Sequence, residues 1–124
     1  MRLPDSPGKT GRIVVSASGE ALDIPVGLWA GLVRSQFWEY LNEVCGTPFS
    51  TYEEDVLDPA QAEAVRAALP SARQNVVFQD FVIHPWSHPD GVAVTTDEQC
   101  RFLDELAALL GYAIEAQSQV WVIL

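Results

Sequence analysis

TTDEQCRFLDELAALLGYAIE, residues 95–115, is the stretch of this chain that shows its secondary structure most clearly. Thr95 and Thr96, each followed three residues later by Glu98 or Gln99, give the capping-box pattern of a helix start. Gly111 is expected to end this helix, because glycine readily takes the left-handed conformation found at helix C-termini. The apolar residues between these signals recur three and four positions apart, which places them on one side of the helix: Phe102, Leu103, Leu106, Leu109 and Leu110.

The segments before and after this helix favour β structure. VWVIL, residues 120–124, is short and β-prone, and is predicted to be a buried strand. Residues 13–15 and 21–26 are predicted to pair as a hairpin around a turn at residues 18–20. NVVFQDFVI, residues 75–83, indicates a further strand with imperfect alternation of apolar and polar residues.

Two more helices are expected before residue 75. In residues 27–45 the apolar side chains recur at helical spacing, and Gly46 followed by Pro48 is predicted to end that helix. Asp58 and Pro59 indicate the start of the next one, which is expected to run to about residue 69 and stop before Pro70. The fold class that follows is α+β, with a small, mainly antiparallel sheet packed with about three helices.

Size and charge limit the function classes. At 124 residues the chain is predicted to form a flexible lead-in, residues 1–11, and a single domain, residues 12–124. The formal net charge of -10 disfavours nucleic-acid binding, and no apolar run is long enough to cross a membrane. The cytoplasm is the expected location. Cys45 and Cys100 belong to no paired-cysteine motif, and are predicted to be reduced thiols.

The acids of the chain are concentrated in one region. Residues 35–65 contain no Lys or Arg, and a one-signed stretch of this kind attracts cationic partners. Within it, residues 51–55 are expected to form an acidic loop. The stretch contains seven acidic residues: Glu39, Glu43, Glu53, Glu54, Asp55, Asp58 and Glu63.

An aromatic residue accompanies these acids. On a helix over residues 27–45, Trp38 is predicted to point almost opposite the apolar stripe, beside Glu39 and Glu43. An exposed Trp next to carboxylates is typical of a protein-binding surface; the alternatives are a covered Trp38 and an acidic face that only keeps the protein soluble. The predicted partner-binding residues are Trp38, Glu39, Glu43, Tyr52, Glu53, Glu54, Asp55 and Asp58.

Signals for chemistry are weaker than signals for binding. Asp80, His84, His88 and Asp90 are residue types that bind metals. A continuous helix would align them, but Pro85 and Pro89 exclude such a helix. Glu53 and its acidic neighbours are adjacent and solvated, whereas a catalytic pair needs burial and contrasting environments. No catalytic residue, metal ligand or cofactor is assigned, and the chain is predicted not to be an enzyme.

The order of these segments suggests a class of protein. EEDVLDPAQAEAVRAALP, residues 53–70, is an acidic segment that leads into a short Ala-rich helix, and residues 95–115 and a short terminal strand follow. This organisation resembles the small acidic immunity proteins of bacterial polymorphic toxin systems. The resemblance implies tight binding to a cognate toxin, often a basic nuclease or another enzyme, and transfers no individual functional residue.

Two other functions stay open at this point. One is a small enzyme or metal-binding domain that uses the loop with His84 and His88. The other is a structural adaptor whose C-terminal strand, residues 120–124, pairs with the sheet edge of another chain.

Overall fold

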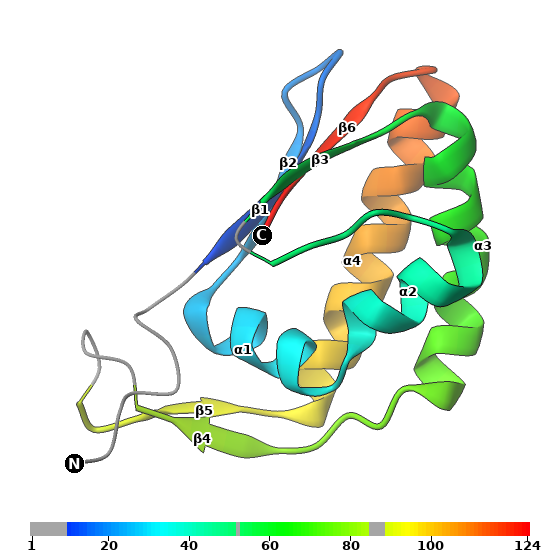
Figure 1. Cartoon of the computed structure of the whole chain (residues 1–124). Coiled ribbons are helices and arrows are strands. Elements are labelled where there is room, and N and C mark those ends of the chain that lie inside the picture. The colour runs from blue at the N-terminus through cyan, green and yellow to red at the C-terminus, as the bar shows by residue number, and fades with distance from the viewer. Residues whose placement is uncertain (1–9, 52, 85–88) are drawn as a thin grey trace.

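The chain has the predicted α+β fold with an antiparallel main sheet. This sheet consists of four strands in the order β2-β1-β6-β3, an order that the sequence did not indicate (Figure 1). A computed structural model describes residues 10–51, 53–84 and 89–124. A separate two-stranded sheet pairs β4 with β5. In chain order the elements are β1 (Gly11–Val15), β2 (Ala21–Ile24), α1 (Val26–Arg34), α2 (Phe37–Cys45), β3 (Glu54–Leu57), α3 (Pro59–Asn75), β4 (Phe81–Ile83), β5 (Val92–Val94), α4 (Thr96–Glu115) and β6 (Val120–Ile123).

The main sheet has one covered face and one open face. Alternate residues of a strand point to opposite sides, so Ile13 and Val15 of β1 are buried while Arg12 is exposed. In β6 the same alternation buries Val120 and exposes Trp121. Figure 1 shows α3 and α4 on one side of the sheet, which is the side that receives the buried residues. The predicted hairpin is confirmed as β1 and β2, and the predicted C-terminal strand is β6, in the interior of the sheet.

The starts of both long helices are confirmed. The Asp58 carboxylate accepts from the Gln61 amide at 2.8 Å, and the Gln61 side chain accepts from the Asp58 amide at 3.0 Å. In α4, Thr95 Oγ1 accepts from the Glu98 amide at 3.1 Å. These bonds satisfy amides that have no partner within the helix, and they fix where α3 and α4 begin.

The predicted single helix over residues 27–45 is wrong, because the chain breaks it into α1 and α2. Gln36 has a φ of 61°, in the left-handed region, which an α-helix does not contain. Ser35 supports the end of α1 by donating its hydroxyl proton to the Leu32 carbonyl at 3.1 Å. The break changes the direction in which each side chain of α2 points, compared with one continuous helix.

Three other predicted boundaries differ from the structure. Pro70 does not end the second helix, because α3 continues to Asn75 and keeps Ala72 buried beyond the proline. The predicted strand over residues 75–83 therefore shrinks to β4 at its end. Gly111 does not end α4 either; it lies inside the helix, where a Cβ atom would come within 3.2 Å of the Arg66 guanidinium carbon.

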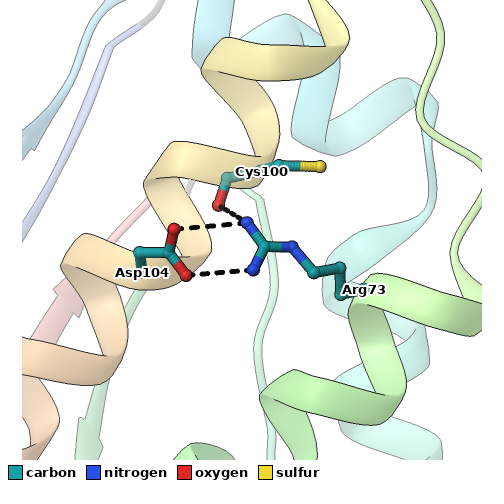
Figure 2. A network of polar contacts seen from close by, with 3 residues as sticks. All are labelled: Arg73, Cys100 and Asp104. Atoms are coloured by element: carbon teal, nitrogen blue, oxygen red, sulfur yellow. Dashed lines mark hydrogen bonds and ion pairs between the residues drawn. The ribbon is translucent and has the colours of Figure 1, made fainter.

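The two long helices are joined by a polar network on their exposed sides (Figure 2). The guanidinium of Arg73 on α3 donates two hydrogen bonds of 3.2 Å to the two carboxylate oxygens of Asp104 on α4. It also donates to the Cys100 carbonyl at 3.3 Å. The Asp104 carboxylate, followed by the Cys100 carbonyl, raises the pKa of Arg73 above its ordinary value. This forked contact fixes the end of α3 against α4.

Candidate protein-binding surface

Trp38 is a core residue, so the prediction that it projects from the surface is wrong. Its side chain is 3% exposed. Its ring centroid lies 4.9 Å from that of Phe37, 5.2 Å from that of Phe49 and 6.2 Å from that of Phe102. The physical reason is the break at Gln36, which turns α2 relative to the phase of one continuous helix. The alternative in which Trp38 is covered is the correct one.

The predicted acidic residues occupy several elements. Glu39 and Glu43 are exposed on α2, whereas Glu53 and Glu54 are exposed at the start of β3. The others in the predicted set have structural contacts or lie outside the described residues: Asp55 accepts from the Ser50 amide at 3.3 Å, Asp58 caps α3, and Tyr52 is not described. The predicted acidic loop is partly an edge strand, because residues from Glu54 onward pair with β6.

The open face of the sheet gathers apolar side chains that no sequence pattern indicated as exposed. The strand register places Ala21, Val14, Trp121 and Val56 in one row across the four strands. Trp121 is 40% exposed and Val56 is 36% exposed, and both belong to the few large apolar side chains that face solvent in the described chain. The row therefore presents a large aromatic ring next to the acidic edge strand.

A second row on the same face is mainly polar. It runs Asp23, Arg12, Ile123 and Glu54 across the four strands. The Arg12 Nε donates to Asp23 at 2.6 Å, and this hydrogen bond and the charge of Asp23 raise the pKa of Arg12. Since Arg12 is paired on the β2 side, its charge is directed away from Glu54 at the β3 side. The β3 end of the face is thus acidic and apolar.

Trp121 could not be identified from the sequence as a surface residue. VWVIL, residues 120–124, is apolar at every position, so alternation gives no indication of which residues face the core. Only the partners of β6 decide this, and they come from distant parts of the chain. Val120 and Val122 turn out to face the helices, which leaves Trp121 on the open side.

The histidine loop offers no assembled metal site in the part of the chain that is described. His84 is exposed at the end of β4, Asp90 is exposed, and His88 lies outside the described residues. Asp80 is engaged elsewhere: its carboxylate accepts from the Thr96 amide at 2.6 Å and from the Thr96 hydroxyl at 2.9 Å, which lowers its pKa. No group of three or more His, Cys, Asp or Glu side chains converges among the described residues.

The adaptor hypothesis fails at its proposed contact. β6 is paired with β1 on one side and β3 on the other, so it has no free edge for another chain. The two cysteines are free thiols, as expected. Burial raises the pKa of the Cys45 thiol, and this thiol contacts the Ala64 carbonyl at 3.5 Å.

A groove between α3 and α4 is the main competing surface. It has a volume of about 660 Å³ and is lined by Leu69, Leu103 and Ile114, with Arg66 and Arg73 at its sides. Both arginines already make contacts within the groove: Arg66 donates to the Ala107 carbonyl at 3.3 Å, and Arg73 binds Asp104 as described above. Glu63 and Asp104 also line the groove, so its walls carry charges of both signs and present no one-signed field to a charged partner.

Comparison with known proteins gives no relative from which a function could be transferred: no family model, no curated protein and no solved structure matches this chain. No helix within the described residues combines the length and the apolar character that a membrane-spanning segment needs.

Proposed function

We propose that this chain is a small acidic binding protein of the immunity or inhibitor type, which neutralises a cognate toxin by direct contact. The surface that makes the contact is the open face of the sheet at its β3 end. The observation that carries this proposal is the position of Trp121, which is 40% exposed beside Val56 and one strand away from the acidic edge.

The apolar part of this surface supplies the anchor. Exposing a Trp is unfavourable in water, and aromatic residues carry much of the free energy of binding at protein contacts. Trp121 lies on an interior strand, held by β1 on one side and β3 on the other, so its backbone is fixed before binding. A rigid aromatic side chain loses little conformational entropy when a partner covers it.

The charged part of this surface selects the partner. Glu54 is exposed on the open face in the row next to that of Trp121, Glu53 is exposed just before β3, and no Lys or Arg occurs in residues 35–65. With a net charge of -10, the protein repels nucleic acid and attracts a protein whose surface is basic. A toxin domain that acts on nucleic acid has such a surface, because it must bind phosphate groups.

Affinity capture with charge-reversed variants tests this proposal. The wild-type chain is used as bait in a lysate of the native host, together with the double variant Glu53→Lys/Glu54→Lys. A control double variant, Glu105→Lys/Glu115→Lys, makes the same charge change on the exposed side of α4. A partner retained by wild type and by the control, but lost from the β3 variant, supports the assignment.

The function itself is tested by co-expression of the captured protein in a heterologous cell. The proposal expects the captured protein to stop growth alone, and expects growth to recover when the wild-type chain is present. The β3 double variant should fail to restore growth, whereas the α4 control should restore it. A captured protein that is harmless when expressed alone contradicts the inhibitor function.

A further inference from the structure

The hydrogen-bond register of β3 shows which of its backbone groups are free. The Glu53 carbonyl accepts from the Leu124 amide at 3.2 Å, which makes these two residues a hydrogen-bonded pair of the antiparallel ladder. Hydrogen-bonded and non-hydrogen-bonded pairs alternate along such a ladder. Asp55 and Leu57 therefore direct their N–H and C=O groups toward β6, while Glu54 and Val56 direct theirs away from the sheet.

These outward groups form an open edge. β3 is the last strand of the sheet, and no backbone hydrogen bond to another described segment uses the N–H or C=O of Glu54 or Val56. Glu54 and Val56 thus present two N–H donors and two C=O acceptors, at the spacing that a neighbouring β-strand needs. An edge of this kind is a template for a further strand.

The side chains at this edge indicate what the further strand carries. Glu54 and Val56 both point to the open face, and Val56 lies directly beside Trp121 in the strand register. A basic side chain opposite Glu54 would favour the pairing of the added strand, because opposite charges directly across a ladder attract. An apolar side chain opposite Val56 would also favour the pairing, because it would pack against Val56 and lie near Trp121.

We propose that the partner contributes an extended segment that adds to β3 as a fifth strand, with a basic residue opposite Glu54 and an apolar residue opposite Val56. This inference rests on the proposed function and names the element of the partner that is recognised. Main-chain hydrogen bonds allow affinity from a small apolar area, and the apolar row on the open face is small. A second copy of this chain is a poor occupant, because it would bring the acids of two β3 strands together.

A peptide of defined sequence can probe this edge before the partner is identified. The peptide Lys-Thr-Val-Thr-Lys, acetylated and amidated at its ends, places its Lys and Val side chains on one face of a strand. The control peptide replaces both lysines by glutamate. Amide hydrogen exchange of the wild-type chain, measured by NMR, should show fast exchange at Glu54 and Val56 and slow exchange at Asp55 and Leu57.

Binding of the Lys peptide should slow exchange at Glu54 and Val56, and the Glu peptide should leave both rates unchanged. Absence of binding by the Lys peptide overturns the inference. Peptide binding that protects amides elsewhere, such as those along the groove between α3 and α4, also overturns it. Dimerisation of the free chain that protects Glu54 and Val56 overturns it too, since the edge would then be occupied by a second copy.

Two substitutions at one position separate the backbone contribution from the side chain. Val56→Ala removes most of the apolar side chain and keeps the outward N–H, whereas Val56→Pro keeps an apolar ring, removes the outward N–H and leaves the ladder to β6 complete. With the captured partner and with the Lys peptide, Val56→Pro should bind about tenfold more weakly than Val56→Ala, the effect of one lost interfacial hydrogen bond.

Equal affinity of these two variants contradicts strand addition. If the partner is still captured in a way that depends on Glu53 and Glu54, the proposed function remains and only the mode of contact is wrong. If Val56→Pro fails to fold, the exchange rates of Glu54 and Val56 in the wild-type chain, with and without the Lys peptide, still test strand addition.

Discussion

Replacing Trp38 by Ala should destabilise the fold strongly, because the structure makes this residue part of the core and not of the binding surface. A buried Trp removes about 200 Å² from water, which corresponds to about 5 kcal/mol of hydrophobic free energy. The indole N–H has no hydrogen-bond acceptor within the described residues, and an unmatched polar group of this kind costs about 1 kcal/mol or more. The net loss on Trp38→Ala is therefore about 3–4 kcal/mol, within the usual range for such core truncations.

Urea unfolding monitored by far-ultraviolet circular dichroism measures this loss without relying on tryptophan fluorescence. A domain of this size has about 5–15 kcal/mol of stability, so the variant should still fold at a clearly lower urea midpoint. Trp38→Phe is the matched control: it keeps an aromatic ring near Phe49 and Phe102 and removes the N–H, so it should cost less than about 1.5 kcal/mol. Trp121→Ala should cost clearly less stability than Trp38→Ala, since 40% of its surface is already exposed to water in the folded chain. Wild-type stability in Trp38→Ala, together with loss of the partner, would refute this account and restore Trp38 as the anchor.

Two further perturbations test the local geometry. Gln36→Gly should raise the free energy of unfolding by several tenths to about 1 kcal/mol. Glycine takes the φ of 61° at lower cost than glutamine, and this gain outweighs the greater entropy of glycine in the unfolded chain. A loss of stability in urea unfolding would show that the turn is not left-handed. Asp80 has a lowered pKa in the folded state, so its bonds to Thr96 stabilise the protein above about pH 4 and are lost as the pH falls through the lowered pKa. Asp80→Asn should flatten the fall in stability below pH 4, and an unchanged pH profile would remove this role for Asp80.

The local signals in the sequence predicted the helix starts and the hairpin correctly. Asp58 and Thr95 cap their helices through side-chain contacts that depend only on residues three positions away, so the sequence contains the whole interaction. The pairing of β1 with β2 is similarly local. Such features form wherever the tertiary structure allows them, and the α+β class follows from them.

The errors arose where tertiary contacts decide between local alternatives. Pro70 is exposed within α3, and the helix continues past it because Leu69 and Ala72 on either side are buried in the core. Gln36 carries no glycine-like signal, so the break between α1 and α2 could not be read from residue types. One unrecognised break was enough to place Trp38 on the wrong side of α2.

The candidate surface depended on strand partners that lie far apart in sequence. Trp121 and Val56 become neighbours only because β3 pairs with β6, more than sixty residues away. Glu53 and Glu54 were correctly selected as exposed acids, but their place on an edge strand follows from that same distant pairing. Composition identified the charge of this surface, and topology placed the exposed apolar side chains of Trp121 and Val56 on it.

The affinity of the captured partner for two alanine variants tests the central claim most directly. Trp121→Ala removes the exposed aromatic side chain of the sheet face, and Tyr112→Ala removes one of similar exposure, 47%, on α4. Isothermal titration calorimetry should show that Trp121→Ala raises Kd by about 30-fold or more, the effect of losing an interface anchor, while Tyr112→Ala changes Kd by less than about twofold. An unchanged Kd for Trp121→Ala, or a loss of affinity confined to Tyr112→Ala, would contradict the assignment of the open sheet face as the binding surface.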